Sequence, residues 1–164
     1  MSIDSLKDVY LHQLQDIHSA NAQSAEITGK LAEAVSDGDL AQALRDGVEG
    51  IRDGMEKVAA ILREHGKDPQ GAHCKGMEGL VKEARAHGLE EDFGDDDARD
   101  AMIITQYQRM AHYAIAGYGC CAAFAGRLGL DDEKGTLKAC LDACYEGDRH
   151  MTDLATSGIN RAAT

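Results

Sequence analysis

Apolar residues recur every three or four positions through four long segments of the chain. This spacing places them on one face of an α-helix and therefore predicts amphipathic helices. The predicted long helices cover about 4–35, 39–65, 97–127 and 131–157. A shorter helix is predicted over 74–88, ended by Gly88. Turn-forming runs of Gly, Pro and Asp separate the helices: SDGD at 36–39, KDPQG at 67–71 and LGLDDE at 128–133.

The pattern predicts an all-α fold, since no run alternates apolar and polar residues with a period of two. The segment between the second and third long helices is long enough to cross from one helical hairpin to the other. Bundles with one such crossover are ferritin-like. We therefore predict a ferritin-like four-helix bundle with a short extra helix in the crossover. The 164 residues have the length of one domain, predicted over 1–164.

Charge and composition limit the partners and the cellular location that the protein can have. The formal net charge is −12 and no basic stripe is present, which predicts no nucleic-acid partner. No apolar run reaches about 18 residues and the N-terminal sequence has no signal-peptide layout, which predicts a cytoplasmic protein without membrane association. The five cysteines are an odd number and are therefore interpreted as free thiols. The acidic loop 90–97 is predicted to be solvated and to cap the following helix.

Two of the predicted helix faces become polar near their middles. Asn21 and Ser24 interrupt the first face, and Asp148 interrupts the fourth. A buried carboxylate is costly unless it is paired, so Asp148 needs a metal, a cation or a hydrogen-bond donor. Arg52 or Arg109 is a candidate cation for this position. The alternative is that Glu49 and Arg52 form a solvated surface pair, three residues apart on one helix.

Four segments resemble the YciE/YciF family of bacterial ferritin-like stress proteins. They are LKDVYLHQLQDIHSA at 6–20, CKGMEGLVKEA at 74–84, RMAHYAIAGYG at 109–119 and CYEGDRHMTDLA at 144–155. The resemblance covers nearly the whole chain. It implies a homodimeric four-helix bundle, associated with stress responses, with a carboxylate-rich centre that resembles a di-iron site.

The chain departs from this family at the bundle centre. Asn21, Ala111 and Ala114 occupy positions where the resemblance implies glutamates, and no Glu-x-x-His sequence occurs in the four long helices. A di-iron or di-manganese site needs a glutamate from each of two helices and a Glu-x-x-His pair from each of the other two. The candidate metal ligands that are left are Glu49, His112 and Asp148. His112, like His18, has the alternative of a flanking residue hydrogen-bonded to a neighbour. We expect no cofactor, and iron or manganese at the bundle centre if there is one.

The cysteines form a second candidate site. In an antiparallel hairpin about the 128–133 turn, Cys121 lies opposite Cys144, with Cys140 one helical turn away. Together with Cys120, these thiols would suit zinc or cuprous ion. The alternative is that they pack as small apolar side chains, and the spacing does not decide between the two. Cys74 is interpreted as a packing residue.

Three functions follow from these observations. The first is a stress-associated protein of the YciE/YciF type with a degenerate metal centre and no redox catalysis. The second is a di-iron- or manganese-type oxidoreductase or peroxide scavenger with a reduced ligand set. The third is a thiol-rich binder of zinc or copper. The sequence leaves open whether the protein is an enzyme and which small molecule, if any, it binds.

Overall fold

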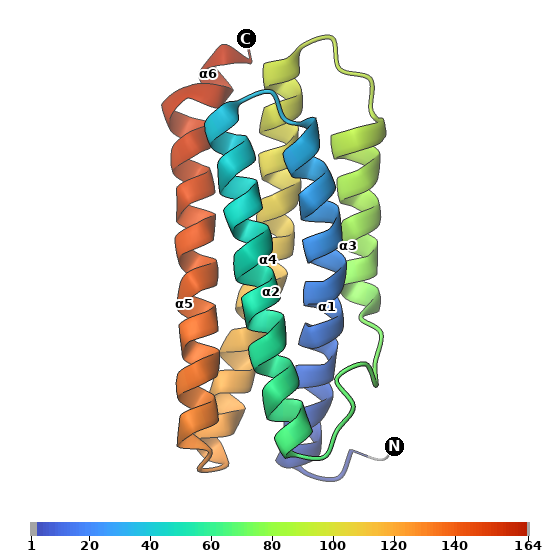
Figure 1. Cartoon of the computed structure of the whole chain (residues 1–164), viewed down its shortest axis with the longest axis vertical. Coiled ribbons are helices and arrows are strands. Elements are labelled where there is room, and N and C mark those ends of the chain that lie inside the picture. The colour runs from blue at the N-terminus through green and yellow to red at the C-terminus, as the bar shows by residue number, and fades with distance from the viewer. Residues whose placement is uncertain (1–2, 164) are drawn as a thin grey trace.

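The computed structural model describes residues 3–163, which are helical through most of their length (Figure 1). The helices are α1 (Leu6–Ala34), α2 (Gly38–Glu64), α3 (Lys75–Arg85), α4 (Asp96–Arg127), α5 (Asp131–Leu154) and the short α6 (Asn160–Ala162). Two π-helical turns follow α3 and α5, at Ala86–Glu90 and Ala155–Ile159. The described part of the chain contains no β-strand, so the predicted all-α fold is confirmed.

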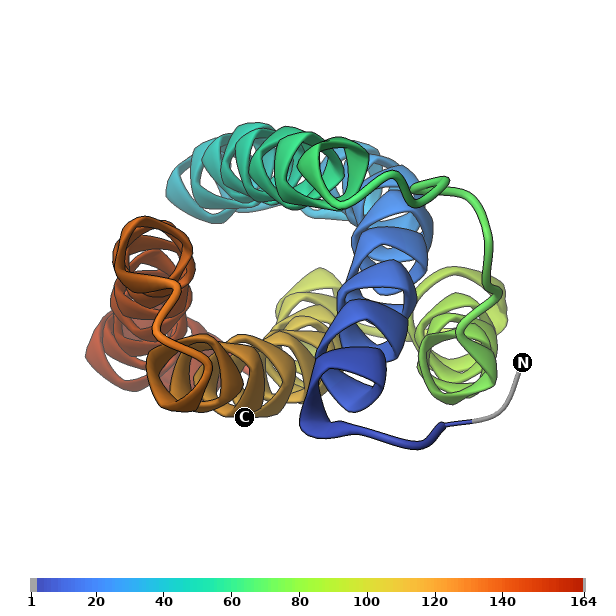
Figure 2. The same ribbon diagram turned by 90° about the horizontal axis from the view of Figure 1, so that it is seen from below.

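The four long helices run side by side along the long axis of the molecule (Figure 1). α1 and α2 form one antiparallel hairpin, and α4 and α5 form the other. The connection between the hairpins runs the length of the bundle and contains α3, which lies outside the four long helices against α1 and α4 (Figure 2). The predicted crossover and its extra helix are therefore confirmed.

Local signals account for most of the helix ends. The side chains of Ser5, Asp37 and Asp95 accept backbone hydrogen bonds in the first turns of α1, α2 and α4. Asp95 belongs to the acidic loop, so its predicted capping role is confirmed. Gly66 and Gly129 follow α2 and α4 with φ of 67° and 74°, a left-handed conformation that favours glycine.

Gly88 differs from the prediction, because it does not end its helix. The chain continues through the π-helical turn Ala86–Glu90, and Gly88 is buried inside it. A Cβ atom at this position would lie 2.9 Å from Cδ2 of Leu31. Gly88 is therefore required for close packing against α1 rather than for a left-handed helix cap. The fourth long helix likewise changes to a π-helical turn after Leu154, whereas the apolar periodicity predicted a regular helix to 157.

The core consists of two apolar clusters at opposite ends of the bundle. One lies near the α1–α2 turn and includes Leu31, Leu44 and Ile103. The other lies near the α4–α5 turn and includes Leu14 and Leu62 among its members. The middle of the bundle, between the two clusters, carries the polar residues described next. Within residues 3–163, none of the helices combines the length and the apolar character needed to cross a membrane.

Candidate functional site at the bundle centre

The inner face of α1 is polar where it passes the middle of the bundle. Asn21, Ser24 and Thr28 are 3%, 5% and 0% exposed. The Asn21 Nδ2 group donates to the Tyr118 hydroxyl of α4 at 2.7 Å, and Ser24 Oγ donates to the Asn21 carbonyl oxygen at 3.2 Å. Asn21 thus faces inward as the sequence predicted, and it is satisfied by a neutral phenol.

Two tyrosines of α4 reach across the centre to α2. A Cβ atom on Gly54 would lie 2.5 Å from the Tyr118 hydroxyl, and one on Gly47 would lie 2.7 Å from the Tyr107 hydroxyl. The two phenols therefore occupy space that only glycine leaves free. Burial raises the pKa of Tyr107 to about 12 and raises the pKa of Tyr118 as well, so both remain neutral at physiological pH.

Of the three predicted metal ligands, the structure brings two together. His112 Nε2 lies 3.1 Å from Asp148 Oδ1, and Gln108 Nε2 also donates to Asp148 Oδ1 at 3.1 Å. This pair lies at the α4–α5 seam, where the His112 side chain is 60% exposed and the Asp148 side chain 18%. Glu49 is exposed on α2 and does not join them. His18 lines a separate groove near the crossover.

The expectation that Asp148 and Glu49 face the bundle centre is wrong. On α5 the inward position at this level is Gly147, where an added Cβ atom would lie 3.6 Å from the Tyr107 hydroxyl. Asp148 is one residue further on and is rotated by about 100° to the flank of the helix. Glycine carries no side chain and gives no hydropathy signal, so the periodicity assigned the inner position to its neighbour.

Of the two alternatives for the arginines, the structure does not support a guanidinium at the centre. Arg52 and Arg109 are both exposed, on α2 and α4. Asp148 is satisfied instead by His112 and Gln108 at the seam, so the bundle needs no buried cation to balance it. The exposure of both Glu49 and Arg52 agrees with the surface alternative.

The donor groups at the centre do not fit a di-iron or di-manganese site. Hard cations take several oxygen ligands, and di-metal bundles supply them as Glu side chains with histidines from facing helices. Here α1 supplies an amide and two hydroxyls, and α4 supplies phenols and the alanines Ala111 and Ala114. Among the residues that the structure describes, no group of three or more His, Cys, Asp or Glu side chains is placed to hold a metal ion.

Three of the four clustered cysteines share one core. Cys121 and Cys140 are buried in the cluster near the α4–α5 turn, and Cys144 packs against it, whereas Cys120 is exposed. Burial raises the pKa of Cys121 to about 12 and the pKa of Cys144 to about 11. The thiolate is the form that binds zinc and copper. The surroundings of these two cysteines therefore favour the protonated thiol and packing over metal ligation. All five cysteines are free thiols, as predicted.

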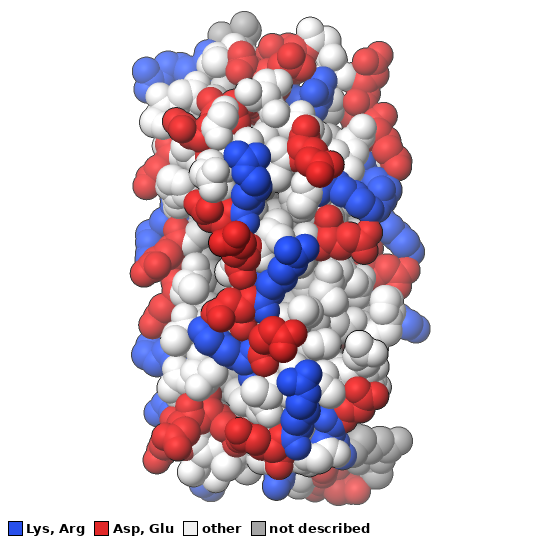
Figure 3. All heavy atoms as spheres, viewed as in Figure 1, with Lys and Arg blue, Asp and Glu red and all other residues white. Residues whose placement is uncertain are grey.

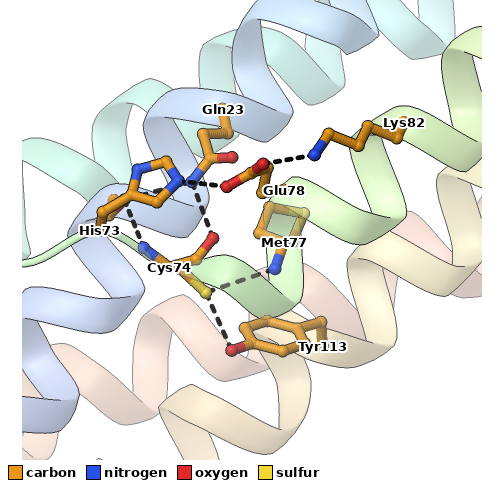
Figure 4. A network of polar contacts seen from close by, with 8 residues as sticks. Gln23, His73, Cys74, Met77, Glu78, Lys82 and Tyr113 are labelled. Atoms are coloured by element: carbon orange, nitrogen blue, oxygen red, sulfur yellow. Dashed lines mark hydrogen bonds and ion pairs between the residues drawn. The ribbon is translucent and has the colours of Figure 1, made fainter.

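Cys74 does more than pack, because it caps α3 and joins it to two other helices (Figure 4). Its Sγ atom accepts a hydrogen bond from Met77 N at 3.4 Å and lies 2.9 Å from the Tyr113 hydroxyl. Tyr113 donates to Asp16 Oδ2 of α1 at 2.9 Å, and Cys74 N donates to Ser19 Oγ, also at 2.9 Å. The network ties the crossover to α1 and α4.

Sequence reasoning missed this network, although its residues lie in segments that carry the family resemblance. Asp16 lies in 6–20, Cys74 in 74–84 and Tyr113 in 109–119. Gly76 belongs to it as well, since a Cβ atom there would lie 2.8 Å from the Tyr113 ring. These three segments meet in the structure, so the residues that carry the family resemblance also hold the crossover in place. Because the segments are far apart along the chain, the pattern within each one could not predict their contact.

The four long helices and the long crossover between the two hairpins define a ferritin-like four-helix bundle. The chain belongs to the family described as "Domain of unknown function (DUF892)", which matches residues 5–164. It is similar to Protein YciF of Escherichia coli (strain K12), with 32% identity over 164 residues that cover 99% of this chain and 98% of that protein. The predicted resemblance is therefore confirmed.

Two solved structures have the same fold. The crystal structure of the E. coli stress protein YciF is 32% identical and matches with a TM-score of 0.89 over 96% of this chain and 99% of that one. The structure of YcfI from Rhodopseudomonas palustris is 30% identical and matches with a TM-score of 0.86 over 92% of this chain and 95% of that one.

Proposed function

We propose that this chain is a stress-associated protein of the YciF type whose bundle centre does not perform di-metal redox catalysis. The observation that carries the proposal is the hydrogen bond between Asn21 and Tyr118. It occupies the position where the family resemblance implies a glutamate ligand, and the facing alanines, Ala111 and Ala114, supply no donor atom. The association with stress rests on the likeness to the E. coli stress protein YciF.

Other features support the cytoplasmic location and the absence of a nucleic-acid partner that we propose. The five free thiols suit the reducing cytoplasm. On the face shown in Figure 3, acidic and basic side chains are intermixed without a continuous basic area, in keeping with a protein that binds no nucleic acid. A homodimer is proposed from the family resemblance, and light scattering on the purified protein tests it.

Metal analysis tests the proposed function. Protein purified without a chelator or a metal-affinity tag, and then dialysed, is expected to contain well under one iron or manganese atom per chain by mass spectrometry. The physical reason is the shortage of oxygen ligands at the centre. Stoichiometric iron or manganese after dialysis, or two metal ions between the helices in a crystal, contradicts the proposal.

A metal-dependent oxidoreductase is the second candidate, and the contact between His112 and Asp148 is the observation in its favour. If metal is retained, the variants His112→Ala and Asp148→Asn locate it. Loss of the metal in both variants assigns it to the α4–α5 seam. The thiol-rich binder receives less support, because burial disfavours the thiolates of Cys121 and Cys144.

A further inference from the structure

The sides of α5 differ in what they contact. Its inner side is buried in the bundle, where Leu137 and Met151 are 0% and 1% exposed. One flank meets α4 through Asp148. The other flank, with Glu146 and His150, lines a cavity of about 410 Å³ between the four long helices. The remaining side of α5 faces away from the bundle, because this helix lies at its edge (Figure 2).

This outward side carries a row of five exposed side chains, which we call the α5 outer stripe. Its members are Lys138, Asp142, Tyr145, Arg149 and Asp153. They are three or four residues apart and therefore lie along one line on the helix. Tyr145, in the middle, is 41% exposed and is one of two exposed large apolar side chains in residues 3–163. A single exposed apolar side chain is ordinary, so the charges around Tyr145 decide what the stripe can do.

The four charges of the stripe are complementary to themselves under a two-fold rotation. Along the helix their signs are positive and negative before Tyr145, then positive and negative after it. In an antiparallel pair of α5 helices with the two-fold axis beside Tyr145, Asp142 lies opposite Arg149 of the second copy. Lys138 then lies opposite Asp153 of the second copy. At a rise of 1.5 Å per residue, these pairs lie about 5 and about 11 Å from the axis along the helix.

The symmetry makes this single register strongly favoured. Because a two-fold axis repeats every contact, the antiparallel register forms four attractive pairs along the stripe. A parallel pair of helices about a two-fold axis would instead place identical charges opposite each other. Like charges that face each other across an interface are destabilising and exclude the wrong arrangement.

Pairing within one helix does not account for these charges. Lys138 Nζ lies 3.9 Å from Asp142 Oδ1, at the limit of an ion pair, and both side chains are more than half exposed. Arg149 and Asp153 have the same spacing of four residues, yet neither forms an ion pair with another residue in 3–163. The charged groups of the stripe are therefore available to a second molecule.

We propose that two copies of this chain associate through the α5 outer stripe, antiparallel about a two-fold axis at Tyr145. The proposal rests on the homodimer of the proposed function and adds the surface that forms it. The two Tyr145 rings pack together at the centre, and the ion pairs around them set the direction and the register. The stripe belongs to a single helix, so it buries less than a standard interface of about 1,600 Å². We therefore expect a dimer that exchanges with the monomer.

Charge reversal tests the opposed pairs, with sedimentation analysis over a range of protein concentrations as the measurement. Arg149→Asp and Asp142→Arg are each expected to weaken the dimer about tenfold, because symmetry makes two attractive pairs repulsive in each variant. The double variant Asp142→Arg with Arg149→Asp restores opposite charges and keeps the formal net charge of −12. Its dissociation constant is expected to return close to that of the parent.

Mixing the two single variants gives an independent test. One variant then carries an acid at both positions and the other an arginine at both, so only the mixed dimer has two attractive pairs there. An equimolar mixture is expected to associate about as tightly as the parent protein, whereas each variant alone associates weakly.

Two further variants test the centre of the stripe and its specificity. Tyr145→Ala is expected to weaken the dimer about tenfold, because it removes the apolar contact at the axis. Arg52→Asp makes the same charge reversal at an exposed position of α2 outside the stripe and is expected to have no effect. All the substituted positions are exposed, and circular dichroism confirms that the variants remain folded.

Each result that overturns the proposal has a distinct meaning. If the parent is a monomer up to about 1 mM, both the homodimer and this interface are wrong. If the parent is a dimer that the single reversals leave unchanged, the homodimer stands and another surface forms it. If the double variant and the mixture stay as weak as the single variants, the two charges do not oppose each other. Metal content is measured separately, so none of these results bears on the absence of di-metal catalysis.

Discussion

At the scale of single residues, buried thiols link the stability of the bundle to pH. Cys121 is fully buried, and its pKa is raised from 9.0 to about 12. Below pH 9 both the folded and the unfolded chain keep this proton. Between pH 9 and 12 the unfolded chain loses it while the folded chain retains it, so the free energy of unfolding falls as the pH rises.

The variant Cys121→Ala isolates this contribution. The free energy of unfolding of the parent protein is expected to fall between about pH 8 and about pH 10, and the fall is expected to be about 1 kcal/mol smaller in the variant. Urea unfolding followed by circular dichroism measures both. The constant cost of the small cavity left by the substitution does not affect this difference. Cys120→Ala, which removes an exposed thiol, serves as the control, and an equal fall in all three proteins contradicts the prediction.

At the scale of the element, α2 shows that the role of a glycine depends on what faces it. Gly47 and Gly54 lie against the hydroxyls of Tyr107 and Tyr118, whereas Gly50 lies on the same helix with open space beside it. All three lower the intrinsic stability of the helix in a similar way, because glycine loses more backbone entropy on folding than alanine does. The first two are required by packing, and the third is not.

Alanine substitutions at two of these positions are therefore expected to have opposite effects. Gly50→Ala is expected to raise the free energy of unfolding by about 0.5–1 kcal/mol through helix propensity alone. Gly54→Ala is expected to lower it by about 1–3 kcal/mol, because the new methyl group displaces Tyr118 from its hydrogen bond with Asn21. Denaturant titrations of the two variants provide the measurement. Stabilisation by both substitutions would show that Tyr118 moves aside without cost.

At the scale of the whole molecule, the arrangement of the long helices does not depend on metal-binding groups at the bundle centre. The helices are held at their ends by two apolar clusters, and the crossover is held by the network of Cys74, Tyr113 and Asp16. Neither feature depends on metal. The middle of the bundle is consequently free to carry neutral groups and a cavity.

Restoring acids should recreate a metal-binding centre in this framework. The triple variant Asn21→Glu, Ala111→Glu and Ala114→Glu is expected to melt at a lower temperature than the parent without metal, because its carboxylates repel one another in a desolvated space. Ferrous or manganous ion is expected to raise its melting temperature by binding the folded state. Arg52 and Arg109 are both exposed, so neither guanidinium lies at the centre in the place of the metal.

A control variant carries the same number of acids on exposed positions of α4, as Thr105→Glu, Ala116→Glu and Ala123→Glu. Its melting temperature is expected to be unaffected by the same concentration of metal. Calorimetric melts with and without metal compare the two variants. Equal melting temperatures of the inner triple variant in both conditions would mean that the centre lacks the geometry of an emptied metal site.

The sequence by itself determined the helices, their order and most of their ends. These features depend on neighbours along the chain: apolar spacing along each helix, caps such as Asp37 and Asp95, and glycines such as Gly66. The family resemblance was visible for the same reason, since each of its four segments is a continuous stretch of sequence, and the departures at Asn21, Ala111 and Ala114 concern single positions.

Only the tertiary structure decided what fills the bundle centre. One residue along α5 turns a side chain by about 100°, and this separates Gly147 at the centre from Asp148 at the seam. The link between Cys74 and Tyr113 spans 39 positions, and the link between Tyr113 and Asp16 spans 97. The cavity arises where small residues of several helices meet. Such features depend on how helices are rotated and placed against one another, which the periodicity of each helix leaves undetermined.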